Sequence, residues 1–263
     1  MSTWRGLFGG RSRTAPPSPP PTDRRPRIEG IPVDRLPELI AEARRGRRRR
    51  LLPAGEELLA RPTRPVEDLD DPSLRLLVDD LFATMAVCEG VGVAANQIGD
   101  ERRVFVYDCV DARGVRHVGH LINPVLEPVG GPARVEVEEE GCLSVPGPVA
   151  EVSRAAAVVV QGLTLAGRTV EFEARGRLAR CIQHECDHLD GTLYVDRLSA
   201  RARRRALKRM AELQDATWAG WDDRAQMLGK SLAADREFPV VAGSPRAHGL
   251  GLRDAQGLAA PAA

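Results

Sequence analysis

The feature that most constrains this chain is the segment QHECDH at residues 183–188. On an α-helix, side chains four residues apart lie on one face about one turn apart, so His184 and His188 can direct ring nitrogens to one metal ion. Glu185 lies about 100° further around the helix, within reach of a water on that ion. This is the HExxH arrangement of metal-dependent hydrolases, in which the glutamate is the general base. The plain alternative is a helix with two surface histidines, but this spacing is rare in a chain with five histidines.

Composition predicts one folded domain with an extension at each end. Residues 1–50 contain eight of the twenty prolines, and thirteen arginines against five acidic residues give them a net charge of +8. Because the whole chain carries +1, residues 51–263 carry −7. We expect residues 1–50 to be a disordered, basic, Pro- and Arg-rich extension. Its run at 47–50 is expected to be solvated, the alternative being contact with nucleic acid or an acidic surface. Residues 51–215 are expected to form the domain and residues 216–263 a flexible tail.

Hydropathy and cysteine usage bear on the compartment. There is no apolar run of eighteen residues, which argues against a membrane span, and no apolar segment near Met1 that indicates a secretory signal. The five cysteines show no disulfide spacing. We therefore expect reduced thiols, a cytoplasmic location and no membrane partner.

The order of the elements predicts an α+β fold. Apolar residues recur at helical spacing from about residue 72 to residue 89, and Ser199 is a good N-cap for a last helix over residues 200–215. Strands are expected over residues 104–107, 117–124, 135–140, 155–165 and 168–174. We thus expect mixed or antiparallel sheets packed around a central metal-binding helix within residues 178–193, with a C-terminal helix.

Glycine and alanine dominate residues 90–97, GVGVAANQ. A dinucleotide site needs a preceding strand and a third glycine that opens a helix, whereas here a helix precedes the segment. We therefore reject a nucleotide loop and expect backbone that lies close to a ligand or to a neighbouring strand. Gln97 is then a polar side chain in tight surroundings that needs a partner. His117 and His120 are expected in a surface turn.

A catalytic metal site needs a third protein ligand and one position for water. In the extended HExxH pattern of proteases the next histidine would fall on Tyr194, which is a poor replacement, and a protease-type glutamate would have to be Glu212 on the basic last helix. Cys142 is the better candidate, since it follows a strand and precedes a proline turn. The other four cysteines are interpreted as small buried apolar residues.

Three segments taken together resemble the signature motifs of peptide deformylases: GVGVAANQIG at 90–99, EGCLSVP at 140–146 and QHECDHLDG at 183–191. The resemblance extends over residues 51–209 and includes RPVEDLDD at 64–71, LINP at 121–124 and LYVDRLS at 193–199. It implies a metal-dependent hydrolase that removes the formyl group from the N-terminal formylmethionine of newly made polypeptides and releases formate.

The resemblance implies the metal ligands and the base. Cys142, His184 and His188 would hold one ion per chain, typically Fe²⁺, with Zn²⁺, Ni²⁺ or Co²⁺ as substitutes; thiolate and imidazole suit several of these. Glu185 would take a proton from the metal's water and later hand it to the departing amine.

Further residues are implied around the ligands. The Gln97 side-chain amide and the Leu143 backbone N–H would donate to the tetrahedral oxyanion. Glu140 resembles the motif glutamate that pairs with an arginine, and Arg154 lies where that partner is expected. Glu140 and Arg154 are expected to support the metal ligands and to take no part in the chemistry.

The substrate contacts are less clearly marked. Residues 91–92 would pair with the extended peptide by strand addition. Val91 and Cys181 are expected to line the methionine pocket, with Gly92 allowing close approach. Charged residues stand where further apolar lining would be expected, namely Glu138, Arg177 and Arg180.

Partners and competing functions follow from the same pattern. The resemblance implies N-formylmethionyl nascent peptides as substrates. Seven basic residues and no acid lie from Arg197 to Arg209, so a ribosome contact through the last helix is a further hypothesis. We expect a monomer. The competitors are a zinc protease with a different third ligand and a non-enzymatic, ribosome-associated relative; loss of metal and activity in Cys142→Ala separates the first from a deformylase.

Overall fold

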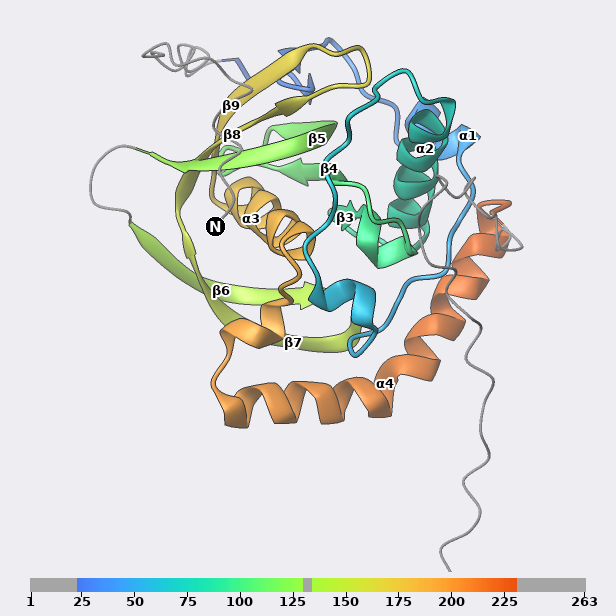
Figure 1. The fold of residues 1–263 in the computed structure, drawn as a ribbon, viewed down its shortest axis with the longest axis vertical. Helices are drawn as coiled ribbons and strands as arrows, with labels where there is room; N and C mark the ends of the chain where they lie inside the picture. Colours follow the sequence, from blue (N-terminus) through green and yellow to red (C-terminus); the bar gives the residue numbers. More distant parts are fainter. Residues whose placement is uncertain (1–22, 130–133, 231–263) are drawn as a thin grey trace, which may run out of the picture.

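The structure is a computed structural model that describes residues 23–129 and 134–230 (Figure 1). Residues 1–22 and 231–263, which include the outer parts of both expected extensions, lie outside the described residues. The elements in chain order are β1 (Arg27–Ile28), β2 (Ile31–Pro32), α1 (Ala41–Arg45), η1 (Glu57–Ala60), α2 (Pro72–Val87), β3 (Gly92–Ala94), η2 (Ala95–Ile98), β4 (Val104–Val110), β5 (Arg116–Pro128), β6 (Val135–Cys142), β7 (Val145–Ala155), β8 (Ala157–Leu163), β9 (Thr169–Arg175), α3 (Arg177–Leu189), η3 (Tyr194–Arg197) and α4 (Ala200–Met227).

Within the described residues, seven strands form one mixed sheet. Its main path runs β2-β1-β5-β4-β3, and β8 and β9 continue from β5. β1 runs parallel to β5, whereas β4 and β8 run antiparallel to it. β5 has thirteen residues and shifts register between Ile122 and Val125. Asn123, with a φ of 51°, lies at this irregularity, and its amide bonds the backbone N–H and carbonyl of Val66, both at 2.8 Å.

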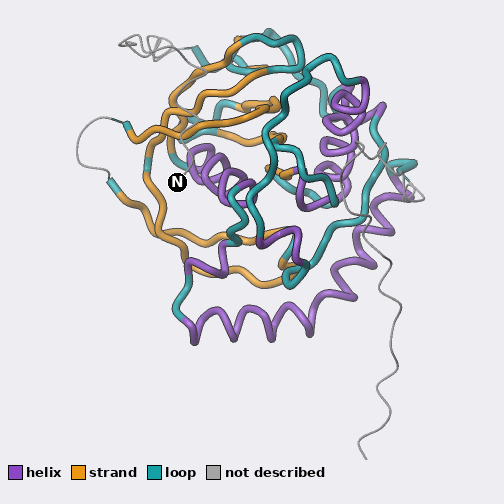
Figure 2. Tube along the Cα trace, viewed as in Figure 1, coloured by secondary structure: helices purple, strands orange, loops and turns teal. Residues whose placement is uncertain are grey.

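A second sheet, formed by β6 and β7 alone, lies on the other side of α3 (Figures 1 and 2). α3 occupies the centre of the molecule, where Leu178, Ile182 and Leu189 pack with Phe105 and Leu121 of the main sheet. The opposite side of α3 faces the β6–β7 hairpin. The predicted α+β fold, with mixed and antiparallel sheets around a central helix and a helix at the C-terminal end, is confirmed. β7 was not expected, because Pro146 and Pro148 are unfavourable in a central strand.

Residues 23–50 are ordered in the structure, which corrects the prediction of disorder for this part of the N-terminal extension. The β1–β2 hairpin pairs with β5, and α1 packs against α2. Glu29, in the hairpin turn, places one carboxylate oxygen 3.1 Å from Nδ1 of His120 and accepts a hydrogen bond from Arg168 at 2.6 Å through the other. The hairpin is therefore tied to both β5 and the β8–β9 turn.

The basic run at residues 47–50 is only partly solvated, since Arg47 and Arg50 are exposed whereas Arg48 is buried. α2 carries two buried aspartates, and buried carboxylates need cationic or hydrogen-bonding partners. Arg45 forms two hydrogen bonds with Asp79, at 2.9 and 2.8 Å, while Arg49 lies 3.6 Å from Asp80. Arg45 and Arg49 are thus held by acidic residues of a distant helix, which composition alone does not reveal.

The C-terminal helix is longer than predicted and continues to Met227, so residues 216–230 are not a flexible tail. Its second half packs near α2, where Ala225 is buried and Trp221 contacts the core. Asp222 accepts a 2.5 Å hydrogen bond from the buried Arg48, and Lys230 donates to the backbone carbonyls of Arg44 and Gly46. The C-terminal end of the described chain is therefore joined to residues 44–48.

The histidines of β5 are buried rather than in a surface turn, so that prediction was wrong. His117 and His120 are each only 7% exposed. Nε2 of His117 lies 3.2 Å from Asp111, and Nε2 of His120 accepts the N–H of Leu165 at 2.9 Å. None of the helices among the described residues is both long and apolar enough to span a membrane.

Candidate active site

Three side chains from two elements meet between α3 and the β6–β7 hairpin. The potential ligand atoms of Cys142, His184 and His188 all lie within 4.8 Å of one another. Sγ of Cys142 is 3.1 Å from Nε2 of His188, and the two imidazole rings are 5.0 Å apart at 68°. One thiol and two imidazoles in this arrangement match the ligands that Zn²⁺ and similar ions take in proteins. The donor set therefore fits a divalent transition metal held by three protein ligands.

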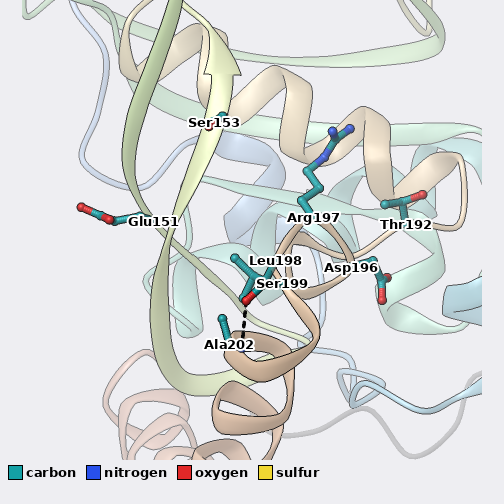
Figure 3. A pocket seen from close by; sticks show the side chains of 8 residues that line it. All are labelled: Glu151, Ser153, Thr192, Asp196, Arg197, Leu198, Ser199 and Ala202. Atoms are coloured by element: carbon teal, nitrogen blue, oxygen red, sulfur yellow. Dashed lines mark hydrogen bonds between the residues drawn. The ribbon is translucent and has the colours of Figure 1, made fainter.

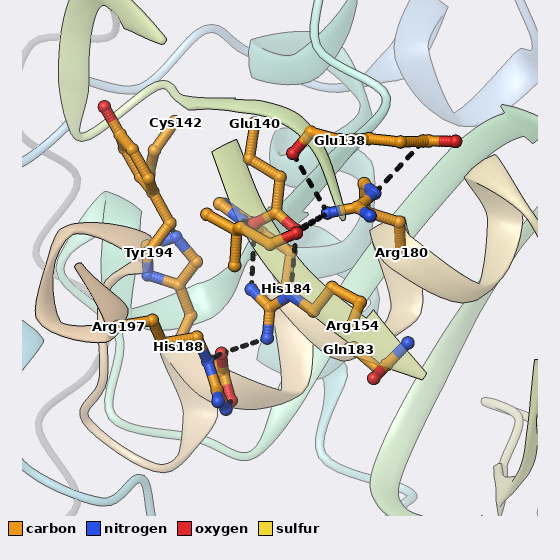
Figure 4. A network of polar contacts seen from close by, with 12 residues as sticks. Glu138, Glu140, Cys142, Arg154, Arg180, Gln183, His184, His188, Tyr194 and Arg197 are labelled. Carbon is orange, nitrogen blue, oxygen red and sulfur yellow. Dashed lines mark hydrogen bonds and ion pairs between the residues drawn. The ribbon is translucent and has the colours of Figure 1, made fainter. Parts of the chain in front are cut away.

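The orientation of His184 is set by Glu140 (Figure 4). Nδ1 of His184 lies 3.0 Å from Oε2 of Glu140, so Nε2 remains for the cluster. Arg154 binds the same carboxylate through two nitrogens at 2.8 and 2.9 Å. Burial alone would raise the pKa of Glu140, but the hydrogen bonds from Arg154 and His184 hold it well below the usual range. Glu140 is therefore an ionised acceptor that fixes the imidazole ring.

Glu185 is buried beside the cluster, at 3% exposure. Burial raises the pKa of its carboxyl to about 7. Within the described residues Oε2 has no hydrogen-bond partner, which leaves one oxygen available to a substrate or a water. A Cβ placed on Gly92 would lie 2.4 Å from Oε1 of Glu185, so the glycine makes room for the carboxylate.

Gln97 is almost fully buried and its amide is held in one orientation. Its Oε1 accepts the N–H of Ala94 at 2.9 Å, so Nε2 faces the cluster. Nε2 lies 3.2 Å from Oγ of Ser144 and 3.7 Å from Sγ of Cys142. The need for a partner, inferred from the sequence, is met by the backbone of the same motif.

The remaining predicted positions lie around this centre. Leu143 follows Cys142 directly and its side chain lies close to Gly90. The carbonyl of Val91 accepts the N–H of Asp108 at 2.9 Å and the thiol of Cys181 at 3.3 Å. Val91, Gly92 and Cys181 are thus neighbours on one side of Glu185. Their role in lining a substrate pocket stays a prediction.

Sequence reasoning missed several polar residues near the cluster. Arg180, interpreted only as a charged residue near an apolar pocket, donates to Oε1 of Glu140 at 2.8 Å. Asp187 accepts hydrogen bonds from Arg154 and from Arg197, both at 2.5 Å. The spacing of Arg180 four residues before His184 places it on the same helix face, and this was the available signal.

A groove of about 770 Å³ lies between β7, η3 and the start of α4 (Figure 3). Its lining is mostly polar and contains none of the three cluster residues: Glu151, Ser153, Thr192, Asp196, Arg197, Leu198, Ser199 and Ala202. It is therefore separate from the candidate metal centre.

Comparison with known proteins gives a consistent result. The family model described as Polypeptide deformylase matches residues 48–204. A curated relative, peptide deformylase 2 of Streptomyces coelicolor, is 50% identical over 147 residues, which cover 56% of this chain and 79% of the relative. The peptide deformylase of Mycolicibacterium paratuberculosis is 46% identical over 166 residues, covering 59% and 84%.

Solved structures are similar over the same part of the chain. A crystal structure of a peptide deformylase from Legionella pneumophila has a TM-score of 0.58 and 37% identity, covering 65% of this chain and 98% of that one. The Ehrlichia chaffeensis peptide deformylase in complex with actinonin has a TM-score of 0.58 and 32% identity, covering 63% and 97%.

Proposed function

The chain belongs to the polypeptide deformylase family, and from this premise we propose which of its residues bind the metal ion and which carry out the hydrolysis. The reaction is the metal-dependent removal of the formyl group from the N-terminus of newly made polypeptides, with release of formate. Residues 51–215 carry the catalytic machinery, and residues 23–50 and 216–230 pack on it.

Cys142, His184 and His188 hold one ion per chain. The observation that carries this assignment is the convergence of their three ligand atoms within 4.8 Å. Fe²⁺ is the proposed native ion, with Zn²⁺, Ni²⁺ or Co²⁺ as substitutes, since one thiolate and two imidazoles suit all four. When bound, such an ion polarises a carbonyl oxygen and lowers the pKa of a coordinated water to roughly 7.

Glu185 moves the protons. Its carboxyl, with a pKa raised to about 7 by burial, accepts a proton from the attacking water and returns it to the departing amine. The fixed amide of Gln97 donates a hydrogen bond to the oxygen on which negative charge develops, and the backbone N–H of Leu143 donates a second. Because the hydrogen bond from Ala94 already holds Gln97 in place, little reorganisation is needed during the reaction.

The substrate peptide lies along β3. This strand is at the end of the sheet path, and among the described strands it pairs only with β4. An extended peptide can therefore add to its free edge with backbone hydrogen bonds. Val91, Gly92 and Cys181 line the site of the first side chain, formylmethionine in nascent chains.

The chain acts as a monomer in the cytoplasm, where nascent polypeptides and reduced thiols coexist; its five cysteines are all free. A contact with the ribosome is proposed for the basic residues at 197–209, which extend from the end of η3 into the first part of α4. Truncation after Leu198 should abolish co-sedimentation with ribosomes at low salt, and binding of the full chain should weaken steeply as salt rises. Unchanged co-sedimentation of the truncated chain contradicts the contact.

The metal assignment is tested by metal content after substitution. Cys142→Ala, His184→Ala and His188→Ala should each fail to retain a stoichiometric ion in equilibrium with a chelator, and should lose formate release with it. Cys88→Ala, at a buried free cysteine after α2, is the matched control and should retain both. A folded Cys142→Ala protein that binds the ion as tightly as the wild type refutes the assignment.

A further inference from the structure

Cys142 lies in the two-stranded β6–β7 sheet, which is separate from the main sheet on which α3, the helix that carries the two histidines, packs. β6 and β7 pair only with each other among the described strands, while α3 packs on the main sheet. The relative position of hairpin and helix therefore decides whether the sulfur meets the imidazoles. An error of about 1 Å in this position would already exceed what a metal site of fixed bond lengths tolerates.

Side chains of β6 and α3 meet in three successive contacts. Alternate residues of a strand share a face, and residues four apart on a helix do the same. Sγ of Cys142 is 3.1 Å from His188, Oε2 of Glu140 is 3.0 Å from His184, and Oε2 of Glu138 is 3.3 Å from Arg180. The first contact involves two proposed ligands, the second orients the third ligand, and the last is an ion pair outside the site.

Arg180 is the residue that joins most groups across this boundary (Figure 4). Its side chain is 9% exposed and donates to Oε1 of Glu140 at 2.8 Å. It also donates to the backbone carbonyls of Val152 at 2.8 Å and Glu136 at 3.0 Å, on the two strands of the hairpin. One guanidinium therefore binds both strands and the carboxylate that orients His184, which lies one turn further along α3.

We propose that Arg180 is a positioning residue for the metal centre: it fixes the β6–β7 hairpin against α3 and holds Glu140 on His184, and thereby sets the affinity for the ion. This rests on the proposed ligand set. Arg154 alone does not meet the need, because it is shared with Asp187, whereas Arg180 adds a second buried cation and the backbone contacts. Arginine suits this task since its planar fork makes several directed hydrogen bonds at once.

The alternative role for Arg180 is to line the site of the first substrate side chain, as its place in the sequence suggested. Its five contacts all run to β6 and β7, which uses every nitrogen of the guanidinium. A residue held in this way is not free to contact a substrate. The two roles give different results, because a positioning role changes metal affinity and a lining role changes the Michaelis constant for particular first residues.

The test measures the Zn²⁺ dissociation constant of the full chain by competition with a chromogenic chelator, together with the visible spectrum of the Co²⁺ form. Arg180→Met should weaken Zn²⁺ binding about 10-fold or more and alter the cobalt–thiolate absorption. Arg180→Lys keeps the charge but not the fork, so its affinity should lie between those of Arg180→Met and the wild type. Arg177→Met, an exposed arginine on the same helix, is the matched control and should bind as the wild type does.

The outcomes separate this role from the ligand assignment. If Cys142→Ala loses the ion while Arg180→Met and Arg180→Lys bind Zn²⁺ as tightly as the wild type, the ligand set stands and the role of Arg180 is wrong, whatever the change in melting temperature. A change in the Michaelis constant confined to certain first residues, with unchanged metal affinity, also overturns it. If Cys142→Ala itself binds normally, the proposed ligand set fails first. Should Arg180→Met not fold, Arg180→Lys decides the matter alone.

Discussion

Replacing Gly92 with alanine should damage catalysis without removing the metal. The new Cβ would lie 2.4 Å from Oε1 of Glu185 and 2.8 Å from two carbons of the same side chain. Ordinary contacts of this kind are about 3.5 Å, so the carboxylate must retreat by about 1 Å. A displacement of this size at a reacting group costs on the order of 100-fold in rate, which corresponds to about 2.7 kcal/mol. Because the displaced atoms are the end of a flexible side chain, the fold should survive.

The assay is formate release from formyl-Met-Ala-Ser by Gly92→Ala and wild-type protein at equal, measured metal content. We expect kcat/KM to fall about 100-fold with the ion still bound. Gly220→Ala is the control, since among the described residues no atom beyond its chain neighbours and the backbone of its own helix lies within 4 Å of the added Cβ; it should leave the rate unchanged and stabilise α4 by about 0.5–1 kcal/mol. Wild-type activity in Gly92→Ala would show that Glu185 need not occupy its observed position.

Three further predictions concern stability. Burial lowers the pKa of His120 to about 4, so between pH 6.5 and 4 the unfolded chain binds a proton that the folded chain does not, and the free energy of unfolding decreases as the pH is lowered. In urea unfolding, His120→Gln should lose about 2 kcal/mol less stability than the wild type when the pH is lowered from 7.5 to 5, and an equal loss refutes this pKa assignment. Asp222→Ala leaves the buried Arg48 without its 2.5 Å partner and should lower the free energy of unfolding by about 1–2 kcal/mol, a value reduced because Asp222 is half-exposed. Adding Arg48→Met should restore part of this stability, and a double variant as unstable as Asp222→Ala argues against the ion pair. Asn123→Ala removes both hydrogen bonds to Val66 and should cost about 2–3 kcal/mol in thermal unfolding, so a change below about 0.5 kcal/mol would contradict their importance.

The central helix and the cluster could be predicted because their signals are local. His184 and His188 share a helix face by spacing alone, and Cys142 ends the strand whose first part was expected over residues 135–140. The convergence of the two segments was not derivable from periodicity; it came from the resemblance of the three motifs. Gln97 was singled out as a buried amide, and the structure supplies its partner within the same segment.

The order of residues 23–50 could not be predicted from the sequence, and the reason is physical. Its arginines suggested a solvated tail, because the residues that fix them lie far along the chain. Asp79 and Asp80 are buried on α2, and Asp222 lies on the far half of α4. A composition count sees the cations and cannot see which distant carboxylates need them.

Arg180 was misjudged for a related reason. An arginine in a helix is usually exposed, so its charge was taken as a complication for an apolar pocket. Its partners are a carboxylate and backbone carbonyls of a hairpin about thirty to forty residues earlier. Backbone carbonyls are available in every sequence and leave no pattern, so only coordinates reveal this contact.

The most direct test of the account compares formate release by the wild type and Glu185→Gln, each carrying one measured equivalent of metal under anaerobic handling. Glutamine keeps the size of the side chain and removes its ability to accept a proton. The account predicts that the wild type deformylates formyl-Met-Ala-Ser and that Glu185→Gln, with its ion retained, is slower by about 100-fold or more. A metal-loaded wild type that releases no formate, or a Glu185→Gln protein as fast as the wild type, would contradict it.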